Sequence, residues 1–548
     1  MALVGVAAIM LLAPAAASAH AYLITTSPAI GAVVPSSPAQ VSLTYDEAVT
    51  VNPGALEVYD AAGKRVDDGG VRHPTPPTIT VAIPERLSRG TYTVAWRVTS
   101  ADTHVVHGVF TFSVGARGNA GAIGARLAAR GQIPAVVSTG FGVVRFLNLL
   151  LLLLCGGGAA AVVLLLRDAG DRTRRRLLRW LVVGGALLAV MAVLGLPFEA
   201  AEANGTGLGG GFAVAALASV RGIRFGQVWL VRAWLAVAFA LLALVLQVAG
   251  NRRRVPGEVL LIGVAFALLL TPSAAGHANV AGSFAFVVDA AHVLAAAAWL
   301  GGLVFVLGAL AISAPADRWP VAIRSVPRLS LLATGAVGVL LMAGVINALI
   351  EVSAVRGLWQ STYGELILAK IALALPLLAL GAFNNRVSVP GLLTGAPPPE
   401  LRARFLRVAS AEVALLVVVV GVTAALIAEA PAKDLLAQTT SITATHAIGP
   451  FSASVVVSPG AVGANTIDVS VHSSARRPPM IGEVDLAADP PTASSLAPLN
   501  LDVIQVSPTR FRVASAPLAR AGTWHLDATV RVGLTEWLAR IPIRIRAA

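Results

Sequence analysis

Hydrophobic residues make up 56% of the 548 residues and charged residues only 13%, which excludes an ordinary soluble protein and predicts several membrane spans. The formal net charge of +13 does not indicate nucleic-acid binding, because the arginines cluster in short loops between apolar stretches. The single cysteine, Cys155, excludes internal disulfides and any multi-cysteine metal site.

Residues 1–19 predict a secretory signal peptide. They are small and apolar and end in Ala17-Ser18-Ala19, which is an A-x-A cleavage signal. The usual positively charged start is missing, so we leave the true start codon open. Cleavage after Ala19 would make His20 the first residue. It would then offer its ring and an α-amine, whose unperturbed pKa is about 7.7 to 8.0.

Residues 20–115 predict a small antiparallel β-sandwich. Apolar side chains alternate along 41–45 and 92–98, with Pro and Gly between the runs. Asp102 and His104 are two residues apart, so a strand that reaches them would place both side chains on one face. Together with the two nitrogens of His20 they would supply three nitrogens and one oxygen, a set that suits square-planar copper(II).

Several short motifs in this stretch match one family. They are His20-Ala21, Ser27-Pro28, Leu43-Thr44-Tyr45, Gly90-Thr91-Tyr92 leading to Trp96-Arg97-Val98, and Ser100-x-Asp102-x-His104 followed by Gly108-x-Phe110-x-Phe112. In these motifs residues 20–115 resemble CopC, the periplasmic copper-binding β-sandwich. The resemblance implies a copper(II) site formed by His20, Asp102 and His104. His107, three residues past His104, would face the other side of a regular strand, so we do not expect it to be a ligand.

A linker is expected at 116–137, and a membrane domain at 138–430. Eight apolar stretches in this domain are long enough to cross a bilayer. We place them at about 138–166, 179–198, 227–249, 258–274, 285–312, 328–350, 364–384 and 406–429. The fourth is short, and we expect it to end at Pro272.

Arginines indicate how these spans are oriented. The loops predicted to be inside carry Arg167, Arg172, Arg174, Arg175, Arg176, Arg179, Arg252, Arg253, Arg254, Arg318, Arg324, Arg328, Arg386, Arg402, Arg404 and Arg407. The loops predicted to be outside carry only Arg221, Arg224 and Arg356. This asymmetry predicts a multi-pass protein of the plasma (inner) membrane with both termini on the external, periplasmic side. The signal peptide independently predicts the same orientation.

Residues 440–548 return to strand patterning and predict a second external β-sandwich. This part resembles the YtkA-like domains attached to some copper proteins, and no ligand is carried over from them. The expected fold class is therefore a polytopic α-helical membrane bundle of about eight spans, flanked by two external all-β sandwich domains.

Three residues near the outer ends of the fourth and fifth spans are candidate metal ligands, namely His277, Asp289 and His292. Charged and imidazole side chains at membrane depth are costly and are candidates for function. Asp289 and His292 are three residues apart and share a helix face. Two alternatives stay open. Asp289 and His292 could form a hydrogen-bonded packing pair, and Lys370 could reach the outer interface or neutralise Asp289.

Sulfur-containing residues are scarce in the bundle. Met191 and Met342 are either soft copper(I) ligands or core-filling residues. Cys155 lies among leucines, and we expect it to be a small apolar core residue.

The membrane domain also carries family motifs. They are Phe225-Gly226 with Trp229 and Arg232, Gly276-His277-Ala278, Asp289-x-x-His292 followed by Trp299-x-Gly301-Gly302-Leu303, Ser361-Thr362-Tyr363-Gly364 with Lys370, and Asn384-Asn385-Arg386. In these motifs residues 140–430 resemble the CopD family of copper-resistance membrane proteins. CopC-like and CopD-like parts in one chain resemble the YcnJ-type copper importers.

The leading hypothesis is a non-enzymatic copper-acquisition protein. Its external domain would bind copper(II), and its membrane domain would move copper(I) or copper(II) inward. The expected partners are copper ion, membrane lipid and an external copper chaperone or cuproenzyme, and no nucleic acid. The absence of a P-loop, of Asp-Lys-Thr-Gly and of Cys-x-x-Cys from the sequence excludes a P-type pump.

Two other functions remain open. In the first, the protein is a metal-delivery module that passes copper to an external cuproenzyme, with the bundle as its anchor. In the second, it is a membrane redox enzyme with haem between His277 and His292. Having only two membrane histidines, one of them at the membrane surface, disfavours the haem hypothesis.

Overall fold

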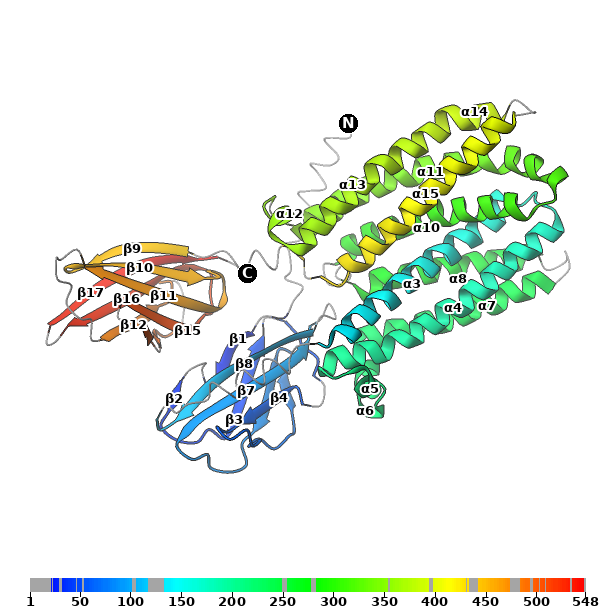
Figure 1. Cartoon of the computed structure of the whole chain (residues 1–548). Helices are drawn as coiled ribbons and strands as arrows, with labels where there is room; N and C mark the ends of the chain where they lie inside the picture. Colours follow the sequence, from blue (N-terminus) through cyan, green and yellow to red (C-terminus); the bar gives the residue numbers. More distant parts are fainter. Residues whose placement is uncertain are drawn as a thin grey trace. The chain divides into compact units, whose positions relative to one another are not determined.

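The computed structural model describes residues 21, 23–28, 32–45, 47–51, 54–100, 105–116, 133–248, 254–276, 282–352, 355–393, 398–429, 431–432, 442–473, 483–492, 496–501, 503–507, 509–532 and 535–546. The helices belong to one compact unit, and the strands on either side of them along the chain belong to another. Each part is described by itself (Figure 1).

The N-terminal strands form two four-stranded sheets. The first sheet contains, in spatial order, β1 (Leu23–Ser27), β3 (Gln40–Tyr45), β6 (Thr78–Ala82) and β5 (Arg72–Thr75). The second contains β2 (Val33–Val34), β8 (Val105–Val114), β7 (Gly90–Thr99) and β4 (Leu56–Tyr59). Alternate residues of these strands form one apolar core, in which Leu43, Val94 and Phe112 are fully buried, as the alternation predicts.

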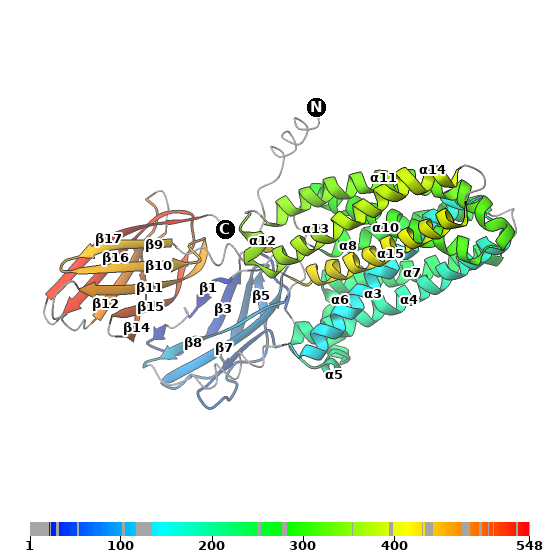
Figure 2. The ribbon, with the colours of Figure 1, turned by 45° about the horizontal axis from the view of Figure 1, so that its top comes forward.

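The C-terminal strands form a second pair of sheets (Figure 2). One has the order β14 (Val503–Ser507), β15 (Arg510–Leu518), β11 (Gly463–Ser473), β10 (Phe451–Ser458) and β9 (Ile442–Ile448). The other has the order β13 (Leu499–Leu501), β12 (Glu483–Asp489), β16 (Gly522–Val532) and β17 (Thr535–Ile545). Trp524 lies in the core between them and donates its indole N–H to the carbonyl of Arg520.

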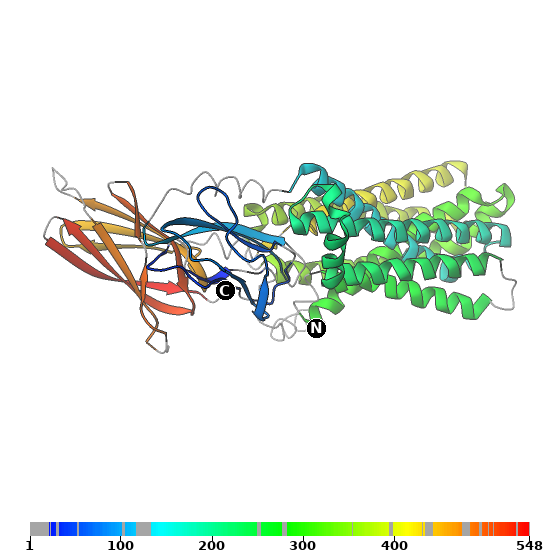
Figure 3. The same cartoon turned by 90° about the horizontal axis from the view of Figure 1, so that it is seen from below.

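Eight helices of the described residues are long and apolar enough to cross a membrane, which confirms the predicted fold class. They are α3 (Ala135–Ala160) with its continuation η1 (Ala161–Leu165), α4 (Asp171–Asn204), α7 (Arg224–Val248), α8 (Arg254–Ala275), α10 (Ser283–Ile312), α11 (Pro315–Val352), α13 (Thr362–Phe383) continued by η3 (Asn384–Ser388) and α14 (Val389–Leu392), and α15 (Pro399–Leu426). Three short helices lie in the connections, namely α5 (Leu208–Gly211), α6 (Val214–Gly222) and α12 (Gly357–Gln360). Figure 3 shows the long helices side by side along a common direction.

The predicted end of the fourth span at Pro272 is wrong, because α8 continues through this proline to Ala275. A proline has no N–H to give to the carbonyl four residues earlier, here that of Leu268. The hydroxyl of Thr271 donates to the Leu268 carbonyl instead, at 2.6 Å. The backbone N–H of Gly276 still bonds the carbonyl of Pro272, so the helix passes the proline without a break.

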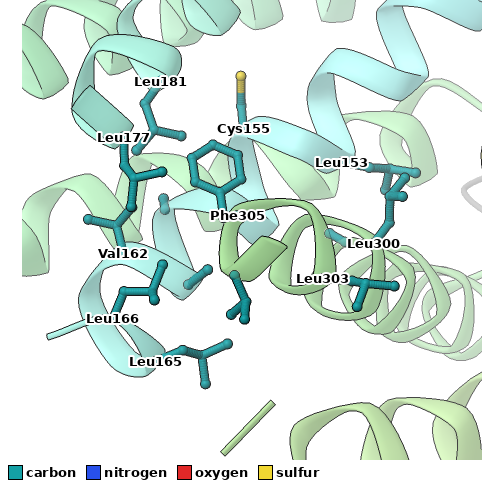
Figure 4. Close-up of a cluster of buried hydrophobic side chains, with 14 of the residues drawn as sticks. Leu153, Cys155, Val162, Leu165, Leu166, Leu177, Leu181, Leu300, Leu303 and Phe305 are labelled. Atoms are coloured by element: carbon teal, nitrogen blue, oxygen red, sulfur yellow. The ribbon is translucent and has the colours of Figure 1, made fainter. Parts of the chain in front are cut away.

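Helix α10 packs against α3, α8, α11 and α15 at the centre of the bundle. Its contact with α3 depends on glycine, since a Cβ built on Gly301 would lie 2.6 Å from the Cα of Gly157. Cys155 is 2% exposed beside this contact and packs with apolar side chains such as Phe305 (Figure 4). It is a core residue, as expected.

The ends of the helices fall into two groups. The turns 166–170 and 313–314, which follow η1 and α10, lie at one end, which we call the arginine-rich end. Contacts between these segments include Thr173 with Ser313, 3.2 Å apart, and Arg328 with Asp168, at 2.8 Å. The bundle therefore begins at Ala135 and finishes at Leu426 on the opposite end, which we call the domain end.

Candidate functional site

Four of the six predicted ligands, His20, Asp102, His104 and His277, lie outside the described residues. The other two, Asp289 and His292, are described. The site is therefore built from the described residues beside the predicted copper ligands and from the polar side chains inside the bundle.

One end of the N-terminal sandwich brings together the chain segments next to three predicted ligands. Leu23 pairs with Tyr45 where β1 begins and β3 ends. The ring of Tyr45 meets that of Trp96 edge to face, with centroids 5.7 Å apart, which joins the two sheets at this end. Thr99 pairs with Val105 where β7 ends and β8 begins. The segments before 23 and between 99 and 105 therefore start from the same end of the sandwich.

The chain neighbours of the predicted ligands are held tightly. Ala21, directly after His20, is 2% exposed in the sandwich core. Ser100, two residues before Asp102, is 4% exposed. Gly108 of the Gly-x-Phe-x-Phe motif makes room for Trp96, since a Cβ at this position would lie 2.7 Å from the indole ring. Rigid elements thus lead into the predicted site from both directions.

A polar group crosses four helices near the domain end of the bundle. It consists of Ser273 on α8, Asp289 and His292 on α10, Asn347 on α11 and Lys370 on α13, and we call it the Asp289 group. The carboxylate of Asp289 accepts hydrogen bonds from Ser273 Oγ at 2.6 Å and from Asn347 Nδ2 at 3.4 Å. These two bonds, from α8 and α11, hold the carboxylate of Asp289 in place on α10.

His292 is half-buried one turn further along α10. Its ring faces α11, where a Cβ built on Gly344 would lie 3.8 Å from its Cε1. Among the described residues, its buried Nδ1 has no hydrogen-bond partner. Nδ1 of His292 therefore takes no part in a hydrogen-bonded packing pair with Asp289, which leaves that alternative open only through the other ring nitrogen, and Nδ1 remains available as a ligand.

Lys370 interacts electrostatically with both Asp289 and His292. Both roles considered for Lys370, reaching the outer interface and neutralising Asp289, stay open. Within the described ranges, no three His, Cys, Asp or Glu side chains cluster closely enough to hold a metal ion. Asp289 and His292 alone thus supply two ligands, and any third must come from elsewhere.

A second buried polar cluster joins α3, α7 and α8. Arg232, 5% exposed, donates to Asn148 Oδ1 at 2.7 Å and to Thr271 Oγ1 at 2.8 Å. Its guanidinium carbon also lies 5.1 Å from the ring centre of Trp229. The sequence identified Arg232 and Trp229 only through a family motif. Asn148 and Thr271 were missed, because each is a common residue type within an apolar stretch.

Sequence reasoning also missed Glu412 on α15. This side chain is 4% exposed and accepts a hydrogen bond from Asn384 Nδ2 at 2.5 Å. It is the one acidic residue in the predicted span 406–429 apart from Glu429 at its end, and this isolation was the available signal. Of the two methionines considered as copper(I) ligands, Met342 is 62% exposed on the outer surface of the bundle and Met191 is half-buried.

Three family models match the chain. The CopC domain matches residues 23–115, the copper resistance protein D-like N-terminal domain matches 134–286, and copper resistance protein D matches 323–426.

Individual relatives match in the same regions. The copper transport protein CutJ of Bacillus subtilis (strain 168) is 27% identical over 380 residues, which cover 68% of this chain and 68% of CutJ. Copper resistance protein C of Pseudomonas syringae pv. tomato is 32% identical over 115 residues, which cover 19% of this chain and 87% of that protein. The crystal structure of CopC from Methylosinus trichosporium OB3b is 31% identical, with a TM-score of 0.16. It covers 18% of this chain and 97% of that one.

Proposed function

This chain belongs to the CopC/CopD family of copper-resistance proteins, and from that premise we propose that it binds copper outside the membrane and carries it inward through the helical bundle. The observation that carries the transport proposal is the Asp289 group, which places a carboxylate, an imidazole and an ammonium across four helices of an otherwise apolar bundle. Such side chains at membrane depth mark ion pathways.

The external site would be formed by His20, Asp102 and His104 and would bind copper(II). Support comes from the donor set, since two imidazoles, an amine and a carboxylate suit tetragonal copper(II). Further support comes from the buried neighbours Ala21 and Ser100, which limit the movement of the chain on either side. Ligands whose chain neighbours are fixed would lose less entropy when the ion binds.

The membrane path would begin at His277, Asp289 and His292. A copper ion that leaves water-exposed ligands needs replacement ligands before it meets hydrocarbon. Nδ1 of His292 is available, and Asp289 is held by neutral donors that an arriving cation can displace. The ammonium of Lys370 would compensate Asp289 while no copper is present, and it would have to move away for copper to pass.

Import is inferred from the proposed orientation together with the predicted external copper site. The arginine-rich end would face the cytoplasm, and the domain end with both β domains would face the periplasm, across the plasma (inner) membrane. The Asp289 group then lies at the external half of the bundle, where copper released by the N-terminal domain would arrive. An external chaperone or cuproenzyme would exchange copper with the same domain.

The test is copper uptake by cells that express the full chain with Asp289→Asn or His292→Ala. Both variants should lower uptake at least about tenfold, because a path with a missing ligand has a higher barrier. Copper(II) capture by the external domain should be unchanged. Matched controls are Asp317→Asn and His446→Ala, which change exposed residues of the same types and should leave uptake intact.

The opposite result would be normal uptake in both variants at normal expression. It would exclude these residues from the path and favour delivery to an external cuproenzyme, with the bundle as an anchor. Metallation of that enzyme, measured in the same cells, separates the two functions.

A further inference from the structure

A cavity of about 340 Å³ lies inside the bundle between α10, α11, α15 and the segment where α13 widens into η3. Most of its lining is apolar. Its polar lining consists of Trp299, Ser330, Thr334, Asn384, Asn385, Arg386 and Glu412. Single π-helical turns within α-helices are frequent at functional sites, and this one begins at Asn384.

Glu412 is the one carboxylate in the cavity lining. Asn384 Nδ2 donates to its Oε1, and the indole of Trp299 lies near the carboxyl. Arg386 is the other charged residue of the lining, and it is exposed. The contacts to Glu412 are N–H donors rather than further oxygen or nitrogen ligands, so the site does not suit a metal ion.

The carboxamide of Asn384 can serve either form of the carboxyl group. Asn384 is 8% exposed, and among the described residues its Oδ1 is buried without a hydrogen-bond partner. A half-turn of the amide would exchange its N–H₂ for this oxygen. The oxygen could then accept the O–H of a protonated Glu412, so both protonation states have a partner in the same place.

The cavity also lies along the same helices as the Asp289 group. His292 and Trp299 are seven residues apart on α10, which is two turns and about 10 Å. A Cβ built on Gly381 of α13 would lie 3.8 Å from Trp299 Cζ2 and 4.0 Å from Glu412 Oε2. Glu412 is therefore displaced from the Asp289 group toward the arginine-rich end, where Asn385 and Arg386 are exposed.

We propose that Glu412 is a proton-binding site and that its protonation is coupled to the passage of copper. A hydronium ion would give its proton to a carboxylate oxygen and leave as water, while the Asn384 amide rotates to accept the new O–H. The proton would enter and leave through the exposed polar end of the cavity. The coupling rests on the proposed transport function, whereas the proton site itself does not.

The proton site is tested by an infrared pH titration of the full chain in lipid, without copper. As the pH falls, the wild type should gain a carbonyl band of a buried protonated carboxyl that Glu412→Gln lacks, whereas any band from the buried Glu199 and Glu351 should be common to both proteins. Glu400→Gln changes an exposed carboxylate on the same helix and should keep the band. Identical carbonyl bands in the wild type and Glu412→Gln over the whole titration would overturn the proton site.

A variant of the partner residue guards against misfolding of Glu412→Gln. Asn384→Ala removes the amide and keeps Glu412, so the band should remain with a titration midpoint that differs from the wild type. An unchanged midpoint would exclude the role assigned to Asn384.

Coupling is tested in proteoliposomes that contain a pH-sensitive dye. Copper movement should produce a proton flux in the wild type and in Glu400→Gln but not in Glu412→Gln. Copper movement without proton flux in the wild type would overturn the coupling alone. Absence of copper movement would overturn the coupling and the transport function together, while the infrared band would still identify Glu412 as a proton site.

Discussion

The hydroxyl of Ser273 donates a hydrogen bond of 2.6 Å to the carboxylate of Asp289. These residues belong to neighbouring helices, α8 and α10, and Ser273 is fully buried. The bond therefore fixes the carboxylate at the depth where a cation path through the bundle would begin. A serine hydroxyl is a neutral partner, so in the proposed path the charged group that competes with copper for Asp289 is the Lys370 ammonium and not Ser273.

Adding one residue before His20 should weaken copper(II) binding by the N-terminal domain. The extension removes the free α-amine from the predicted donor set and leaves both imidazoles and the carboxylate in place. The fragment 20–115 suits this test, because relatives such as copper resistance protein C consist almost entirely of the matching part.

The electron paramagnetic resonance spectrum of the copper(II)-loaded fragment should show one nitrogen ligand fewer after the extension. The affinity of the fragment for copper(II) should fall at least about tenfold. His107→Ala is the matched control and should change neither property. An extended fragment with an unchanged spectrum and affinity would exclude the amine as a ligand.

The sequence predicted the architecture well because its signals are local. Long apolar stretches predicted eight spans, and alternation predicted the strands of the N-terminal and C-terminal regions. The predicted end of the fourth span was wrong because the hydroxyl of Thr271 bonds the Leu268 carbonyl, which Pro272 cannot do. A pattern of hydrophobicity does not reveal such a bond.

The candidate site was predictable only in part. Asp289 and His292 are distinctive within an apolar span, so the sequence identified them directly. Ser273 and Asn347 could not be found, since their role depends on which helices pack together. The role of Glu412 could not be predicted for the same reason, because its neighbours Asn384 and Trp299 come from two other helices.

Reporter fusions test the orientation of the bundle. Fusions at Gly170 and Asn251 should report the cytoplasm, and a fusion after Ala548 should report the periplasm. The reason is the excess of arginines in the loops predicted to be inside. A cytoplasmic C-terminus would show that one of the eight helices does not cross the membrane.

The close contact between α3 and α10 predicts a stability effect. Gly301→Ala should lower the free energy of unfolding by about 1–3 kcal/mol, because its Cβ would lie 2.6 Å from the Cα of Gly157 and force the helices apart. Gly335→Ala on α11 is the matched control, since nothing lies within 4 Å of its added Cβ. Thermal unfolding in detergent measures both, and equal stabilities would contradict the packing.

His107 predicts a pH dependence in the N-terminal domain. Partial burial and then the Arg97 guanidinium, opposite it on β7, hold the pKa of His107 below its usual range. A lowered pKa means that the unfolded chain binds the proton more readily, so the folded state loses stability as the pH falls below about 6.5. The contribution of neutral His107 to the stability of the folded state is fully present above that pH.

Nuclear magnetic resonance titration of the fragment 20–115 should give His107 a midpoint below about 6.5, and Arg97→Ala should raise this midpoint. His107→Gln should remove part of the acid-induced loss of stability. A midpoint that does not change in Arg97→Ala would exclude the guanidinium as a cause.

Copper uptake into proteoliposomes of known orientation tests the transport proposal most directly. Vesicles whose domain end faces outward should accumulate radiolabelled copper inside, and Asp289→Asn should abolish that accumulation. Vesicles of the opposite orientation should accumulate little. No accumulation in either orientation, or accumulation only when the arginine-rich end faces outward, would contradict a copper importer.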